Sequence, residues 1–222
     1  MTKGVGGSTA DRELWALGPR PGGAGAITAD ERSGRLEHAR QLMADAGVEA
    51  MLVRGGASLR YFTGVAWGQS ERLVALILPR RGRPIMICPA FELGTMQASL
   101  LIEAEIRTWE EDEDPCALAG RALGELGLRT LAIDPELPFV FYDGLRLGAP
   151  SLEVTSAASV VDGCRRIKSP AELALMSQAK AITLEVHRRA ARMLAPGMTT
   201  GQVRSFIDEA HRRLGAPGSP KT

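Results

Sequence analysis

The stretch RRIKSPAELALMSQAKAIT, residues 165–183, carries the strongest helix-start signal in this 222-residue chain. The Ser169 hydroxyl can accept a bond from the first free N–H groups, Pro170 stands where a missing N–H costs nothing, and Glu172 completes a capping box. Apolar residues then recur at helical spacing until LAPG, residues 194–197, ends the pattern. This spacing predicts a long amphipathic helix whose buried stripe consists of Leu175, Ala179, Ile182, Val186, Ala190 and Met193.

A second amphipathic helix is expected directly afterwards. Thr199 or Thr200 caps it, and Gly215 and Pro217 stop it. Its expected apolar face consists of Val203, Phe206, Ile207, Ala210 and Leu214. Because little sequence follows, we expect these two helices to lack a sheet to pack against, and the tail to be exposed, sticky or poorly ordered when the chain is alone.

Upstream, from Thr28 to Asp162, helical and strand patterns alternate. Thr28 and Glu31 form a capping box, and a short helix or turn ends at Gly64. The expected helices cover 28–47, 90–101, 114–127 and a short stretch near 139–147, and the expected strands cover 48–53, 72–79, 84–89, 104–109, 130–134 and 152–155. The turn RRGR at 80–83 joins two of these strands in a hairpin. The alternation predicts a layered α/β domain with a mixed sheet.

Three segments follow from this pattern. Residues 1–27 are rich in Gly and Pro and are expected to form a loosely structured arm, with at most one short helix around 11–17. Residues 28–164 form the α/β domain, and 165–222 begin another domain. The first residues contain no apolar signal region and no later run is long enough to span a bilayer, so neither export nor a membrane partner is expected.

Composition narrows the choice of partners and compartment. With 27 basic and 26 acidic residues the formal net charge is +1, which gives no overall field for nucleic acid or an anionic membrane. Cys88, Cys116 and Cys164 are odd in number and form no C-x-x-C pair. They indicate reduced thiols, and a cytoplasmic location fits best.

No catalytic or metal-ligating residue is assigned from the sequence. His38, His187 and His211 each fall on an expected helix without a second ligand at metal spacing, so they are interpreted as solvated. The acidic run 110–114 lacks the spacing of a calcium loop and precedes a helix, whose N-terminus favours acids. Neither a phosphate-binding glycine loop nor a G-x-S-x-G nucleophile motif is present.

One loop is a candidate binding rim. The stretch LRYFTGVAWGQSERLV, residues 59–74, places Tyr61, Trp67 and Arg72 around two glycines. An exposed indole and a guanidinium beside a turn could contact a ligand. The alternative is that Tyr61 and Trp67 cover the edge of their own core while Arg72 is a solvated charge at a strand edge.

The order of these motifs is similar to a known family. SLRYFTG, the apolar hairpin, RRIKSPAELALMSQAKAIT and then LAPGMTTGQVRSFI resemble the pita-bread metallopeptidases, in particular bacterial Xaa-Pro dipeptidases and aminopeptidases with a creatinase-type N-terminal domain. The resemblance extends from about residue 6 to residue 218. It implies a ribonuclease H-like N-terminal domain with a mixed sheet, followed by the first two helices of a pita-bread α+β domain.

The resemblance also implies a function for the complete protein. In that family two divalent metals (manganese, cobalt or zinc) are held by two Asp, one His and two Glu that lie downstream of Thr222, and no residue here matches them. The expectation is therefore an inactive chain, cut short by truncation, frameshift or an incomplete record. The implied partners are a proline-containing peptide and a second copy in a homodimer, with Trp67 and Arg72 at the substrate rim.

Two other readings stay open at this stage. The creatinase-type domain also occurs in relatives that bind peptides or proteins without hydrolysis, so the chain could be a stand-alone binding module. A small-molecule-binding α/β domain is a third reading, although no phosphate loop supports it.

Overall fold

A computed structural model of the chain describes residues 4–18 and 23–216. It divides into two compact units, Ile27–Ile167 and the combination of Met1–Ala26 with Lys168–Thr222. Each unit has its own core, and each is described by itself below.

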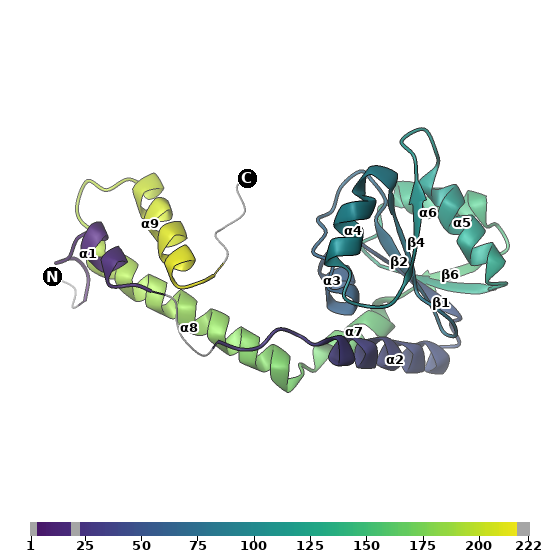
Figure 1. The fold of residues 1–222 in the computed structure, drawn as a ribbon, viewed down its shortest axis with the longest axis horizontal. Helices are drawn as coiled ribbons and strands as arrows, with labels where there is room; N and C mark the ends of the chain where they lie inside the picture. The colour runs from purple at the N-terminus through teal and green to yellow at the C-terminus, as the bar shows by residue number, and fades with distance from the viewer. Residues whose placement is uncertain (1–3, 19–22, 217–222) are drawn as a thin grey trace. The chain divides into compact units, whose positions relative to one another are not determined.

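The Ile27–Ile167 unit is built on one mixed six-stranded sheet (Figure 1). Its strands are β1 (Ala50–Arg54), β2 (Ala75–Pro79), β3 (Ile85–Pro89), β4 (Glu105–Trp109), β5 (Thr130–Ile133) and β6 (Glu153–Ser156). The spatial order is β4-β3-β2-β1-β5-β6. β2 runs antiparallel to both neighbours, whereas β1 pairs parallel with β5, β3 with β4, and β5 with β6. The predicted hairpin and mixed sheet are confirmed.

The central strands carry apolar side chains on both faces, as a sheet covered on both sides requires. All five residues of β1 are buried. Met51 and Val53 belong to one core cluster, and Ala50 and Leu52 belong to the other, because successive side chains point to opposite faces.

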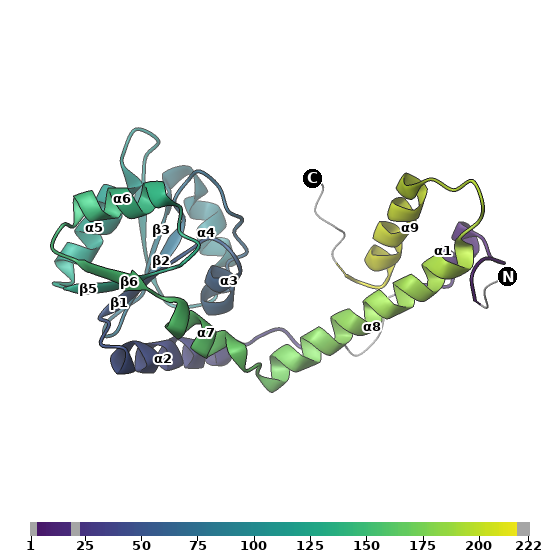
Figure 2. The same ribbon diagram turned by 180° about the vertical axis from the view of Figure 1, so that it is seen from behind.

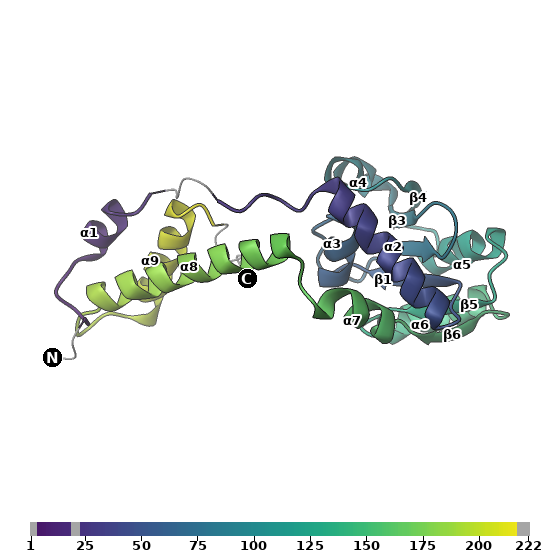
Figure 3. The ribbon, with the colours of Figure 1, turned by 90° about the horizontal axis from the view of Figure 1, so that it is seen from below.

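Helices cover both faces. One face is covered by α2 (Ala29–Asp45), α3 (Ala57–Thr63), α4 (Leu93–Ser99, after the 3-10 turn Ala90–Glu92) and α7 (Ala158–Arg166). The other is covered by α5 (Pro115–Glu125) and α6 (Phe139–Gly148). Figure 3 shows α2 crossing its face beside α7, and Figure 2 shows α5 and α6 next to each other.

Local signals account for most helix ends. The Thr28 hydroxyl accepts a hydrogen bond from Glu31 N at 3.2 Å, which starts α2. Gly64 ends α3 at a φ of 86°, a left-handed conformation that favours glycine. Among the described helices, none is both long and apolar enough to cross a bilayer.

Helix α7 differs from the sequence prediction. The pattern predicts no helix over residues 158–164, and it places Arg165 at the opening of the long helix that follows. α7 spans Ala158–Arg166, and its residues Val160, Val161 and Cys164 are buried against α2. It is nine residues long and starts without a side-chain cap, so the local signals used for the other helices are missing.

The second unit is a three-helix cluster. It contains α1 (Ala10–Trp15), α8 (Pro170–Met193) and α9 (Thr200–Arg213). The predicted capping box of Ser169 with Glu172 forms. Of the two residues offered as a cap for the next helix, Thr199 is the one that caps α9, and it forms a further capping box with Gln202. The core of the unit consists of Ile182, Val186, Ala190, Met193, Phe206, Ala210 and Leu214.

The stripe predicted on α8 is buried only over its C-terminal half. Ile182, Val186 and Met193 are buried, whereas Leu175 is half-buried and Ala179 is exposed. The reason is that α1 and α9 pack only on the C-terminal half of α8, so the N-terminal half of the stripe is not covered by them.

Part of the expected N-terminal arm is ordered in this unit. α1 lies against α8 and α9, and Ala10, Leu14 and Leu17 pack on their shared core. The tail helices therefore have a packing partner within the chain.

Candidate functional site

The rim loop, residues 64–74, runs from the end of α3 to the start of β2. It passes over the carboxyl end of β1, where Gly55 N donates to Val74 O at 2.8 Å. A Cβ at Gly55 would lie 2.9 Å from Gly68 O and 3.5 Å from Trp67 Cδ1. The absence of a side chain at Gly55 is what lets the loop approach this strand.

Trp67, the first rim candidate, is half-buried and packs against the core cluster below α3. Its indole sits beside Gly55, and the backbone of the next residue closes over the same glycine. At this position the indole ring covers part of the hydrophobic core, and one edge of the ring remains accessible to solvent.

Arg72, the second candidate, is held in a fork. Nε and Nη2 donate to the two carboxylate oxygens of Glu111 at 2.9 and 3.0 Å, and Nη1 donates to Glu71 at 2.5 Å. The fork with Glu111 raises the pKa of Arg72 and lowers the pKa of Glu111. The bidentate geometry that suits a substrate carboxylate is thus taken by a carboxylate of the acidic run.

Tyr61, the third candidate, faces a different set of partners. Its hydroxyl donates to Cys164 O at 2.8 Å, its ring lies edge-on to Phe62, and the Arg35 guanidinium stands 4.1 Å from its centroid. These contacts fasten α3 to α7 and α2. Tyr61 is turned toward these helices, whereas Arg72 reaches across to the loop after β4.

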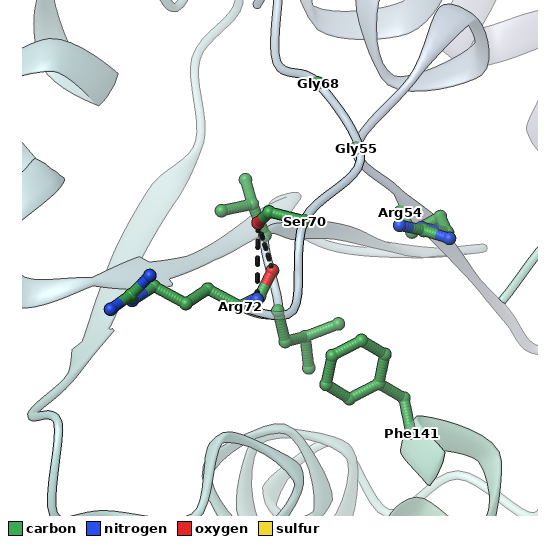
Figure 4. A pocket seen from close by; sticks show the side chains of 8 residues that line it. Arg54, Gly55, Gly68, Ser70, Arg72 and Phe141 are labelled. Atoms are coloured by element: carbon green, nitrogen blue, oxygen red, sulfur yellow. Dashed lines mark hydrogen bonds between the residues drawn. The ribbon is translucent and has the colours of Figure 1, made fainter. Parts of the chain in front are cut away.

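A narrow pocket lies under the rim loop (Figure 4). It is lined by Arg54, Gly55, Gly68, Ser70, Arg72, Leu73, Val74 and Phe141, and it is too narrow for a water molecule. In the close-up, the guanidinium groups of Arg54 and Arg72 point away from each other. Ser70 Oγ accepts from Arg72 N at 3.2 Å and donates to Arg72 O at 3.3 Å, which closes a tight turn. As it stands, this pocket holds no ligand-sized space.

Behind the rim loop, a polar cluster joins the ends of β1 and β5. Arg54 and Asp134 are each only 7% exposed. Arg54 Nη1 donates to Glu136 O at 3.0 Å, Asp134 Oδ1 accepts from Glu136 N at 3.0 Å, and Gln69 donates to the Glu136 carboxylate at 3.1 Å. Burial raises the pKa of Asp134, even though the N–H bond from Glu136 opposes that shift. The cluster ties the rim loop to the exit of β5.

Sequence reasoning did not single out Arg54, Asp134, Glu136 or Glu111 individually. Arg54 is the last residue of β1 and Asp134 directly follows β5, and the parallel pairing of β1 with β5 brings both to the same edge of the sheet. Both strands were predicted, so their parallel pairing was the one signal from which the closeness of Arg54 and Asp134 could have been inferred.

A second, open groove lies at the carboxyl ends of β5 and β6. Its walls include Asp134, Leu137, Phe139, Tyr142 and Thr155. The Phe139 side chain is 74% exposed, and its ring centroid is 5.9 Å from that of Tyr142. The groove is mostly apolar, which suits contact with another apolar surface better than chemistry.

The described residues, 4–18 and 23–216, gather no group of three or more His, Cys, Asp or Glu that could hold a metal ion. His38 and His187 are exposed on α2 and α8, and His211 lies half-buried on α9. The donor set that the family resemblance implies for two divalent metals therefore does not fit this part of the chain, and the geometry supports no metal-assisted step within it.

Comparison with known proteins gives one family and several relatives. The model of the Creatinase/Prolidase N-terminal domain matches residues 35–167. "Probable dipeptidase PepE" of Mycobacterium tuberculosis is 32% identical over 178 residues, which are 79% of this chain and 47% of that protein. This chain therefore spans about half the length of the curated relatives it matches.

Solved structures share this fold. The crystal structure of dipeptidase PepE from Mycobacterium ulcerans matches with a TM-score of 0.71 at 29% identity, over 84% of this chain and 50% of that chain. Recombinant prolidase from Thermococcus sibiricus matches with a TM-score of 0.74 at 21% identity, over 85% and 50%. The mixed sheet, its helical layers and the sequence match together show that the chain belongs to the Creatinase/Prolidase N-terminal domain family.

Proposed function

We propose that this chain forms the N-terminal part of a Xaa-Pro dipeptidase-like metallopeptidase. The observation that carries the proposal is the 32% identity to the probable dipeptidase PepE, which runs over 79% of this chain and includes just under half of that protein. In the complete enzyme, two divalent metals would activate a water molecule for attack on the peptide bond before proline. Their ligands would come from chain after Thr222.

In this proposal the Ile27–Ile167 unit shapes access to the substrate. Trp67 and Arg72 stay the proposed rim residues, with an indole that can pack on a proline ring and a guanidinium that can bind a carboxylate. The support is their place on one loop over the carboxyl edge of the sheet. Tyr61 is proposed in a supporting role, because its contacts to Cys164 and Arg35 fix α3, which leads into this loop.

The same unit is proposed to contribute to a homodimer. Support comes from α6, where Phe139, Val140 and Leu147 are 74%, 68% and 67% exposed. Large apolar side chains gathered on one surface element are typical of interaction sites. Light scattering coupled to size-exclusion chromatography would test it: Phe139→Ser should lower the mass of the complete protein toward that of a monomer.

A cytoplasmic location is also proposed. Its support is that Cys88, Cys116 and Cys164 are free and buried. Burial raises the pKa of each thiol to about 11, so all three stay protonated and unreactive near neutral pH.

The test of the peptidase proposal compares two proteins. The coding sequence after Thr222 is read and the complete product is assayed on Xaa-Pro dipeptides with added manganese, beside the 222-residue chain alone. We expect a downstream set of two Asp, one His and two Glu, turnover by the complete product that a chelator abolishes, and none by the short chain. A natural stop after Thr222, or a complete product without this activity, would refute the proposal and favour a binding module.

A further inference from the structure

The N-terminal segment, residues 4–17, lies outside the part of the chain matched by the family domain, yet it is bound closely to α8. Gly6 N donates to Ala191 O at 2.9 Å, and Ser8 N donates to Arg192 O at 3.1 Å. Carbonyls in the last turn of a helix have no partner within the helix. The segment therefore caps the end of α8 from the other end of the sequence.

A buried carboxylate anchors the segment. Glu13 is only 6% exposed, and its Oε2 lies 3.0 Å from Arg189 Nη1 and 3.9 Å from Arg192 Nη1. Arg189 in turn donates to Glu185 at 2.8 Å, which orients its guanidinium. Removing one partner of a buried pair is costly because the other charge is left uncompensated.

Apolar and backbone contacts complete the docking surface. Ala10, Leu14 and Leu17 pack on the core that α8 and α9 share. Arg213 Nη1, on α9, donates to Leu14 O at 2.9 Å and caps the end of α1. α1 has only six residues, far below the length at which an isolated helix is stable in water, so its helical state depends on this docking.

We propose that residues 4–17, which contain the short helix α1, are a clasp that binds a docking site on the C-terminal half of α8 and on α9. This clasp can be separated from its docking site while the Ile27–Ile167 unit stays folded. The site recognises one carboxylate through Arg189 and Arg192, and two or three small or branched apolar side chains through the core beside them. The clasp covers apolar surface on the two tail helices. This inference is independent of the proposed peptidase function.

The first test uses point variants of the full chain and hydrogen exchange read by mass spectrometry. Glu13→Gln should speed amide exchange in residues 4–17 by about tenfold or more, as expected for loss of a hydrogen bond to a charged group. Asp11→Asn is the matched control, since it removes a charge from the exposed side of the same helix. Peptides covering β1 should exchange equally in all three proteins, which shows that the variants are folded.

A double-mutant cycle identifies the anchor. If Glu13 and Arg189 act as a pair, Glu13→Gln and Arg189→Gln together should speed exchange less than the product of their separate effects. Fully multiplicative effects, or equal exchange in Glu13→Gln and the parent chain, would overturn the proposal.

The second test separates the clasp. A protease site placed in the sequence GPRPGGAG, residues 18–25, is cut in the folded full chain, and native mass spectrometry follows the released fragment. We expect the fragment to stay bound to the remaining chain and to dissociate at least tenfold more readily in Glu13→Gln, as expected for a charged hydrogen bond. Equal loss of the fragment from both proteins would show that residues 4–17 are only a tethered end.

Discussion

At the residue scale, Gly55 is the position where the end of β1 and the rim loop come closest. Gly55→Ala would place a Cβ 2.9 Å from Gly68 O, a backbone atom that cannot move alone. We expect this variant to lose about 1–3 kcal/mol of unfolding free energy, the usual cost of overpacking, measured by urea denaturation. Gly68→Ala is the control, because a Cβ there meets nothing within 4 Å. Equal stability of the two variants would mean that the loop gives way freely.

Arg72 can be tested for contact with substrate separately from its bond to Glu111. In the complete enzyme, Arg72→Ala should raise KM for Xaa-Pro dipeptides if the guanidinium reaches the substrate. Glu111→Gln breaks the same fork from the other side and should leave KM unchanged. Both side chains are substantially exposed (39% and 55%), so neither variant should shift Tm by more than a few degrees. An equal rise of KM in both variants would assign Arg72 to holding the loop after β4.

The site shows what single residues reveal before a structure is known. Trp67 and Arg72 stood out because an indole and a guanidinium lie in a polar, glycine-flanked loop. Their partners could not be predicted in the same way. Glu111 lies 39 residues from Arg72, and its selection from an acidic run depends on how β4 is placed in the sheet.

At the element scale, docking of α1 should depend on pH through Glu13. Burial raises the pKa of this carboxyl, but the bond from Arg189 and the positive charges of Arg189 and Arg192 outweigh burial, so its pKa is lowered from the usual 4.5. Because the pKa of Glu13 is lower in the docked state, ionised Glu13 stabilises docking at any pH above its ordinary pKa. This stabilisation is lost as the pH falls through the pKa of the docked state. Besides these groups Glu185, whose pKa is also lowered, pairs with Arg189 from the same helix.

The measurement is the affinity of the severed clasp for the remaining chain between neutral pH and about pH 3. We expect affinity to be constant down to about pH 5 and to fall below it. Glu13→Gln should bind more weakly at neutral pH and lose most of this dependence, leaving only the part due to Glu185. If the parent chain and Glu13→Gln had the same affinity at every pH, the pH dependence would come from carboxyl groups other than Glu13.

Elements were predictable where their signals are local. The capping boxes at Ser169 and Thr199 and the left-handed glycine at Gly64 each lie within a few residues of the end they define. α7 was missed because it lacks such a cap, and the docking of α1 was missed because its partners lie at the far end of the chain. Apolar periodicity shows that one face of a helix must be buried, but it does not show which element packs against that face. That partner is determined by the tertiary structure.

At the scale of the whole molecule, the two compact units predict where a protease will cut. The boundary lies at Ile167, whose side chain is 84% exposed, between Arg166 and Lys168. Under limited trypsin digestion we expect cleavage there first and a resistant fragment that contains Ile27–Arg166. Mass spectrometry of the fragments checks it. First cuts inside β1–β6 instead would show that the sheet is not the more stable part.

The distance in sequence between α1 and its partner has a consequence for synthesis. Glu13 and Arg189 are 176 residues apart. A ribosome adding 5–20 residues per second needs roughly 10–35 s to make that length. During this interval the sheet can grow outward from β1, first toward β4 and then toward β6, while α1 waits with its apolar residues unprotected. α1 is thus synthesised long before the helices that cover it, and it reaches its packed position only after α8 and α9 have been made.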